Sequence, residues 1–242
     1  MNWKQLISAK RFGMEEFHEE RQENRSEFQR DYDRLIFSAP FRRLQNKTQV
    51  FPLPGSVFVH NRLTHSLEVA SVGRSLGDDV AKALLERHPE LQDSFLPEIG
   101  SIVSAACLAH DLGNPPFGHS GEKAISTFFS EGKGVRLKEK QPNGEQLSPM
   151  EWEDLTHFEG NANAFRILTH QFEGRRRGGF VLTYTTLASI VKYPFSSSLA
   201  GKKSKFGFFV SEEESYRKIA TDLGLIQLSK HPLKYARHPL VY

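Results

Sequence analysis

The segment from Pro97 to Gly113 is apolar on nearly every side, with the sequence PEIGSIVSAACLAHDLG. A helix without a polar face belongs in the interior of a protein, so this segment predicts a central helix against which others pack. Gly113 stands where a left-handed residue is expected to cap the C-terminus of such a helix. The rest of the chain has to fold around this helix.

Two polar residues, His110 and Asp111, lie at the end of the predicted central helix. Both can bind a divalent metal ion. The residues that follow, LGNPPFGHSGE, contain helix breakers that force a tight, irregular turn, a costly backbone unless it holds something in place. The turn leads to His119 and Glu122 at the start of another helix, where free N–H groups favour a phosphate or a hydroxide. The segment indicates a metal-dependent hydrolytic centre.

Helical spacing of apolar residues recurs through most of the chain, so we expect an all-α fold. Ser26 is the expected cap of the first helix and Pro40 its expected stop, and Pro89 bounds the second. Strand signals are weak: one short β-hairpin is expected near 48–60, residues 205–211 are ambiguous, and the charged segment 131–149 is typical of a long surface loop. Helices are expected at 25–41, 62–88, 97–113, 120–132, 157–172, 183–194 and 211–225.

The composition is that of a globular protein with a buried core. A chain of 242 residues with 38% hydrophobic content can form one large domain or two small ones. Its apolar runs are shorter than the roughly 20 residues of a membrane-spanning helix, and the N-terminus lacks a signal-peptide pattern. We therefore expect a cytoplasmic protein that does not interact with membranes. Cys107, the one cysteine, is expected in the core, and the net charge of +3 suits a small anionic substrate.

His65 is a third candidate metal ligand, on the helix expected at 62–88. If that helix packs against the central one, two imidazoles and a carboxylate can surround one ion. Such a set suits Mn, Fe, Co, Ni or Zn better than Mg, which prefers oxygen ligands. For an isolated His–Asp pair an ordinary helix cap is the commoner interpretation, and Glu122 alone could also be a cap. The second group, His119 with Glu122, argues for the metal centre.

Six blocks of sequence, taken in order, resemble the deoxyguanosinetriphosphate triphosphohydrolases (dGTPases) of the HD-domain phosphohydrolase superfamily. The resemblance covers nearly the whole chain. It implies an HD-domain helical fold, one catalytic divalent metal, and hydrolysis of a deoxynucleoside triphosphate to the deoxynucleoside and inorganic triphosphate. The blocks are FRRLQNKTQVF, HNRLTHSLEVA, HDLGNPPFGHSGE, HFEGNANAFRIL, VKYP and KFGFFVSE.

The resemblance assigns roles to individual residues. It implies that three residues hold the metal, which could be Mn, Mg, Fe, Co, Ni or Zn, that two form the catalytic pair, and that five contact the substrate. Among the last, Gln49 is where the family reads the nucleobase, and Arg62 matches a phosphate-contacting arginine. The metal ligands are His65, His110 and Asp111; the catalytic pair is His119 and Glu122; the substrate contacts are Gln49, Arg62, Asn114, Asn161 and Lys192.

One metal ligand of the family pattern is not found. HD-domain enzymes complete the metal shell with a second aspartate, which in the dGTPases follows a stretch like HPLVY. In this chain that stretch is residues 238–242, and the last aspartate, Asp222, precedes it. We therefore expect residues 1–242 to be the N-terminal portion of a dGTPase-like HD domain that ends before the last metal ligand, with water in the vacant position.

Two alternatives remain open at this point. A different HD phosphohydrolase, acting on another nucleotide, would share the metal core. A catalytically incomplete fragment could instead serve a regulatory or nucleic-acid-binding role, in which the basic stretches GRRRGG and GKKSK touch phosphates. The partners expected are dGTP or another dNTP, a nucleotide effector or single-stranded DNA, and further copies of the chain in a homo-oligomer.

Overall fold

Helices make up most of the regular structure, so the predicted helical fold is confirmed. The computed structural model describes residues 2–16, 25–47, 61–139, 144–174, 177–201 and 205–241. The hairpin expected near 48–60 lies outside these residues. The helices and strands are α1 (Trp3–Leu6), α2 (Glu27–Ile36), α3 (Ala39–Arg43), α4 (Arg62–Arg87), α5 (Ile99–Ala109), α6 (His119–Ser130), α7 (Pro149–Thr156), α8 (Gly160–Thr169), α9 (Tyr184–Ile190), α10 (Glu213–Asp222), β1 (Gln227–Ser229) and β2 (Lys234–Tyr235).

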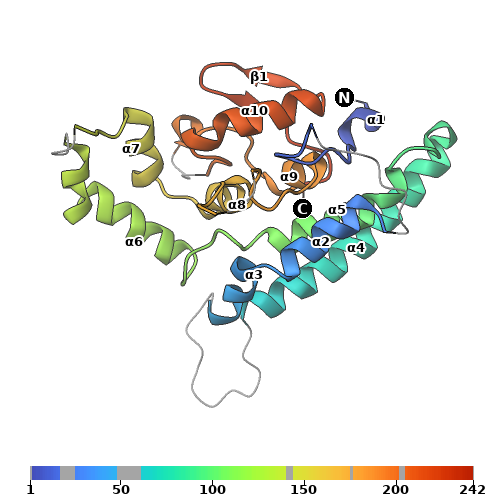
Figure 1. Ribbon diagram of the computed structural model, residues 1–242, viewed down its shortest axis with the longest axis horizontal. Helices are drawn as coiled ribbons and strands as arrows, with labels where there is room; N and C mark the ends of the chain where they lie inside the picture. The colour runs from blue at the N-terminus through green and yellow to red at the C-terminus, as the bar shows by residue number, and fades with distance from the viewer. Residues whose placement is uncertain are drawn as a thin grey trace, which may run out of the picture.

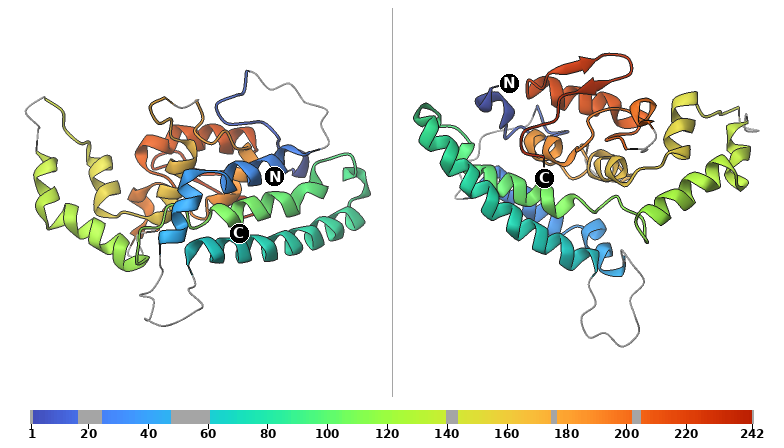
Figure 2. Two further views of the ribbon diagram at one scale, coloured as in Figure 1. Left: turned by 60° about the horizontal axis from the view of Figure 1, so that its bottom comes forward. Right: turned by 180° about the vertical axis from the view of Figure 1, so that it is seen from behind.

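Helix α5 is the central helix that the sequence predicts. Ten of its eleven residues are buried, the exception being the half-buried Val103. Helices α2, α4 and α9 all pack against it. In Figures 1 and 2, α2, α4 and α5 form one layer, and α8, α9, α10 and the small sheet form a second layer beside it. The C-terminal end of α5 faces the second layer, where Gly113 lies close to the backbone of α8.

Glycine residues allow α4 and α5 to pack at very short distance. A Cβ atom on Gly77 would lie 2.7 Å from the Cα of Gly100, and one on Gly73 would lie 2.6 Å from the Sγ of Cys107. The buried face of α4 consists of small residues apart from Arg62 at its start. The two helices run antiparallel, so the start of α4 lies beside the end of α5.

The first predicted helix is two helices in the structure. Ser26 caps α2 as predicted, with its side chain accepting a hydrogen bond from the Gln29 amide. The expectation that Pro40 ends this helix is wrong, because the break comes earlier. Ser38 caps a new helix, α3, and Pro40 lies in its first turn. Proline is tolerated there because the first amides of a helix have no intrahelical acceptor.

Helix α7 and the β1–β2 sheet were not predicted. The segment 131–149, expected to be a loop, contains a 3₁₀ helix at Lys133–Lys138 and leads into α7. Helices α6 and α7 extend from the two layers as an arm (Figure 1).

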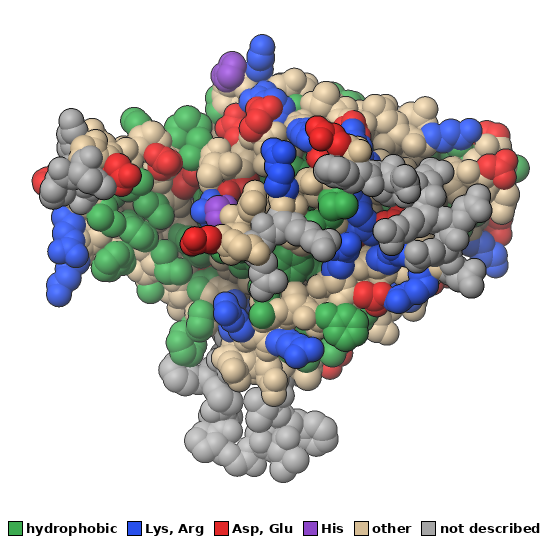
Figure 3. Space-filling view, viewed as in Figure 1, with side chains coloured by type: hydrophobic (Ala, Val, Ile, Leu, Met, Phe, Trp, Pro, Cys, Tyr) green, Lys and Arg blue, Asp and Glu red, His purple; other side chains and the backbone are tan. Residues whose placement is uncertain are grey.

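Exposed apolar side chains, including Phe128, Val135 and Met150, gather on this side of the surface (Figure 3). Within the described ranges, no helix has both the length and the apolar character needed to cross a membrane.

His238 ties the C-terminal segment to the start of the chain. Its Nδ1 accepts a hydrogen bond from the Leu240 amide at 3.1 Å, and its Nε2 lies 3.1 Å from the Leu6 carbonyl oxygen. A neutral ring with its proton on Nε2 satisfies both contacts. Burial lowers the pKa of His238 to about 4, although the Leu6 carbonyl opposes the shift.

A side chain at Gly77 should separate α4 from α5. We expect Gly77→Val to lower the free energy of unfolding by about 2 kcal/mol, because backbone atoms of Gly100 have to move. The exposed Ser75 on the same helix provides the control, and Ser75→Val should change stability by about 0.5 kcal/mol or less. Urea unfolding measures both. Equal effects of the two substitutions would contradict the close packing.

The stability of the fold should decrease as the pH is lowered, because of His238. The folded-state pKa is depressed, so the contribution is present in full above the unfolded value of 6.5 and is lost as the pH falls toward 4. The shift corresponds to a loss of up to about 3 kcal/mol. Unfolding free energies measured between pH 7 and pH 4 should decrease less steeply in His238→Asn than in the wild type. Parallel pH profiles would show that His238 does not titrate this way.

Candidate metal centre

The structure brings together the three predicted metal ligands. His65 comes from the first turn of α4, and His110 and Asp111 directly follow α5. One ligand atom from each residue lies within 4.8 Å of the others. The two imidazole rings are 5.3 Å apart, centre to centre, and inclined by 72°. The antiparallel packing of α4 and α5 therefore produces the convergence on which the sequence-based prediction depends.

The His110 ring is oriented for metal binding. Its Nδ1 lies 2.6 Å from the Cys107 carbonyl oxygen, so Nδ1 carries the proton and Nε2 keeps its lone pair. Such a bond from the far ring nitrogen is common in metal-ligating histidines. Burial lowers the pKa of His110, with Asp111 opposing the shift and His65 and Arg62 adding to it. A neutral imidazole is the form that binds metal.

Asp111 is held by two neighbouring side chains. Arg62 Nη1 lies 2.7 Å from Oδ2, and the side-chain amide of Asn114 donates a hydrogen bond to Oδ1. Arg62 is only 3% exposed, and its Nε has no hydrogen-bond partner among the described atoms. A buried donor without a partner costs about 1–3 kcal/mol. The Arg62 Nε is therefore a buried donor that the surrounding side chains leave unsatisfied.

The turn after Asp111 is constrained at three residues. The left-handed conformation expected at Gly113 is wrong: positive φ angles occur instead at Phe117 (66°) and Gly118 (55°). Gly113 is needed for a close approach, since a Cβ atom there would lie 2.1 Å from the backbone of α8. A positive φ is unusual for a residue as large as phenylalanine. Lys47 secures the turn by donating to the Asn114 carbonyl oxygen at 3.1 Å.

The turn delivers His119 and Glu122 to the first turn of α6. His119 Nδ1 and Glu122 Oε2 are 3.1 Å apart, and the side-chain exposures are 85% and 13%. Glu122 Oε1 accepts a hydrogen bond from the Gly160 amide at 2.9 Å. The carboxylate is thus anchored to α8 while the imidazole remains open to a ligand.

A cavity of about 380 Å³ joins two of the candidate metal ligands, His110 and Asp111, to the His119–Glu122 pair, while His65 is not among its lining residues. Asn161, a predicted substrate contact, lines it, whereas Lys192, another such prediction, does not. Gln49 lies outside the described residues. The lining residues are Arg62, His110, Asp111, Asn114, Phe117, Gly118, His119, Ser120, Glu122, Asn161 and Lys205.

The sequence-based prediction did not include Glu159 and Lys205, which form an ion pair at this cavity. Lys205 Nζ lies 2.7 Å from Glu159 Oε1 and 3.6 Å from Glu122 Oε2. Burial lowers the pKa of Lys205, but the two carboxylates outweigh it and the pKa is raised, so the side chain is cationic. Glu159 lies inside the helix expected at 157–172, and nothing local in the sequence marks it as an N-cap or connects it to a lysine 46 residues away.

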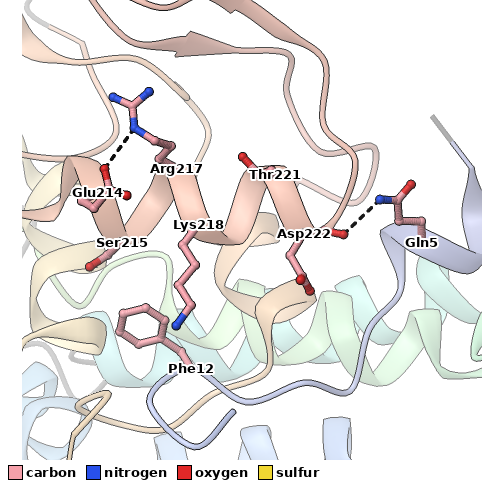
Figure 4. Close-up of a pocket in the computed structure, with 8 residues that line it drawn as sticks. All are labelled: Gln5, Phe12, Glu214, Ser215, Arg217, Lys218, Thr221 and Asp222. Carbon is pink, nitrogen blue, oxygen red and sulfur yellow. Dashed lines mark hydrogen bonds and ion pairs between the residues drawn. The ribbon is translucent and has the colours of Figure 1, made fainter. Parts of the chain in front are cut away.

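A larger hollow lies between the N-terminal segment and α10 (Figure 4). Its volume is about 810 Å³, and it shares no residue with the centre described above. Its cations are paired with carboxylates: Lys218 with Glu15, and Arg217 with Glu213 and Glu214. Because these cations are already paired with carboxylates, the hollow is a weaker candidate for an anion-binding site than the cavity at His110 and Asp111.

Comparisons with known proteins match the chain to the HD domain and to dGTPase-like proteins. The family model of the HD domain matches residues 62–177, a range that contains the three candidate metal ligands, His119, Glu122 and Asn161. A deoxyguanosinetriphosphate triphosphohydrolase-like protein of Synechocystis sp. is 45% identical over 100% of this chain and 56% of its own length. A protein of the same description from Pseudomonas aeruginosa is 46% identical over 100% of this chain and 53% of its own length.

The description of a third relative lacks the words "like protein". The deoxyguanosinetriphosphate triphosphohydrolase of Yersinia enterocolitica is 36% identical over 97% of this chain and 51% of its own length. The chain spans about half the length of the curated relatives it matches.

Removing one imidazole should weaken metal binding. We expect His110→Ala to reduce the affinity for Mn²⁺ at least about 10-fold, because a ligand held by the Cys107 carbonyl is lost. Equilibrium dialysis against Mn²⁺ measures this. His88→Ala removes an exposed histidine paired with Glu90 and should leave the affinity unchanged. Equal affinities in both variants would exclude His110 as a ligand.

Proposed function

The chain belongs to the dGTPase-like HD-domain phosphohydrolases, and on this basis we propose that it hydrolyses a deoxynucleoside triphosphate, dGTP foremost, to the deoxynucleoside and inorganic triphosphate. The observation that supports this proposal most strongly is that one cavity is lined by His110 and Asp111, two of the three candidate metal ligands, and by a His–Glu pair. Hydrolysis of a phosphate ester needs an electrophilic centre and a group that moves a proton, and residues with the chemistry to supply each line this cavity.

The donor set fits a first-row divalent cation held by His65, His110 and Asp111. When bound, such a cation supplies Lewis acidity that polarises a phosphoryl oxygen and lowers the pKa of water. We propose Mn²⁺ as the first ion to test, with Mg²⁺, Fe, Co, Ni and Zn as alternatives. Water molecules or a carboxylate outside the described residues would complete the shell.

The side chains around the centre have three proposed roles: they orient Asp111, transfer a proton and stabilise negative charge. We propose that Asp111 is kept ionised and oriented by Arg62 and Asn114. The His119 Nδ1–H bonds to Glu122, which leaves Nε2 able to accept a proton from the attacking water or to deliver one to the departing oxygen. Arg62 and Lys205 place positive charge at the cavity wall, where negative charge accumulates on the phosphates.

Four further residues are proposed to contact the substrate. Asn114 and Asn161 line the cavity and can donate to a phosphate or a sugar oxygen. For Lys192, and for Gln49 as the reader of the base, the proposal rests on the family resemblance.

A product assay with all four dNTPs tests the function. The protein with Mn²⁺ should release inorganic triphosphate, with dGTP giving the highest kcat/KM. Release of pyrophosphate, or turnover of nucleoside monophosphates instead, would favour a different HD phosphohydrolase. No turnover of any dNTP would contradict the proposal.

Loss of the His119 imidazole should separate chemistry from metal binding. We expect His119→Ala to reduce kcat about 100- to 10,000-fold, because proton transfer is lost, while Mn²⁺ affinity stays near the wild-type value. Lys123→Ala, at an exposed position of the same helix, should have wild-type kcat. Retained turnover in His119→Ala would remove this residue from the mechanism.

A further inference from the structure

The N-cap residue of α8, Glu159, makes more contacts than capping requires. Its Oε2 accepts a hydrogen bond from the Asn161 amide at 2.7 Å, which caps the helix. Its Oε1 accepts from the Asn161 side chain at 2.8 Å and from Lys205 Nζ at 2.7 Å. The side chain is 1% exposed. A buried carboxylate in an ion pair is costly to maintain, and an uncharged cap such as Ser or Asn would serve the helix equally well.

Lys205 links this carboxylate to the His119–Glu122 pair. Its ammonium lies 2.7 Å from Glu159 and 3.6 Å from Glu122, so Glu159 is the closer partner. Glu122 in turn lies 3.1 Å from His119 Nδ1. Four charged or polar groups from α6, α8 and the segment at 205 thus form one continuous chain that ends at the imidazole.

The Lys205 ammonium lies closer to Glu159 than to Glu122, and this difference determines the effect of Glu159 on the site. Two carboxylates compete for the Lys205 ammonium. Because Glu159 holds it more closely, Glu122 Oε2 remains available to the His119 ring. Without the charge on Glu159, the ammonium would move toward Glu122 and compete with His119 for the same oxygen.

We propose that Glu159 is a positioning residue: by holding Lys205, it leaves Glu122 to fix the Nδ1–H tautomer of His119. It acts through Lys205 and does not touch the substrate. The proposal builds on the proposed function in assigning His119 to proton transfer, but the state of the ring can be measured without any substrate.

Selective ¹⁵N labelling of histidine tests the state of the ring. Above pH 8 the ring-nitrogen signals show which nitrogen carries the proton, with His119→Gln used to assign them. In the wild type Nδ1 should be protonated. Glu159→Gln keeps the cap oxygen but removes the charge, and should shift the balance toward the Nε2–H form. In a Lys205→Met background, the same substitution should have no further effect on the ring.

Kinetics give a second readout. Glu159→Gln should lower kcat about 10- to 100-fold, as expected for a misplaced proton-transfer group, but change it by no more than about twofold when Lys205 is already methionine. Glu214→Gln, an exposed carboxylate on α10, is the matched control and should behave as the wild type. If the wild type turns over no nucleotide, the proposed function fails, and the ring signals still decide on Glu159.

Two results would overturn the proposal. One is wild-type ring signals in Glu159→Gln. The other is an equally large effect of Glu159→Gln with and without Lys205, which would show that Glu159 acts by another route. If Glu159→Gln does not fold, Lys205→Met provides the test, because it leaves the α8 cap intact. It should leave the ring in the Nδ1–H form, and a shift toward the Nε2–H form would then contradict the proposal.

Discussion

The close antiparallel contact between α4 and α5 is the constraint on which the centre depends. Gly73, Gly77 and Gly100 remove the side chains that would keep the helices apart. As a result the first turn of α4 lies beside the last turn of α5, and the two imidazoles come within 5.3 Å, centre to centre. The candidate metal ligands are thus positioned by helices in the core, and rigid elements hold a site more precisely than loops do.

The start of α8 is the second organising element. A Cβ atom on Gly160 would lie 2.0 Å from Asn114 Oδ1 and 2.9 Å from Glu122 Oε1. Glycine at this position therefore lets both side chains reach the same backbone. Asn114 contacts the candidate metal ligand Asp111 and Glu122 contacts His119, so one helix terminus connects the two groups of candidate site residues.

Local patterns predicted much of this arrangement. The apolar run of α5 and the cap at Ser26 depend on neighbouring residues, and they were confirmed. Helix α7 was missed although Ser148 and Glu151 form a capping box that the sequence contains. The conformation of Gly113 could not be predicted, because a glycine needed for contact with a distant helix looks the same in sequence as a capping glycine. Pairing of Lys205 with Glu159 depends on the packing of segments far apart in the chain.

The central claim is that His65, His110 and Asp111 hold one divalent ion. A crystal of the protein grown with Mn²⁺ tests it directly through the anomalous signal of the metal. We predict one strong peak within about 2.3 Å of a nitrogen from each histidine and of an Asp111 oxygen. No peak at the three residues, with the ion bound elsewhere, would contradict the account.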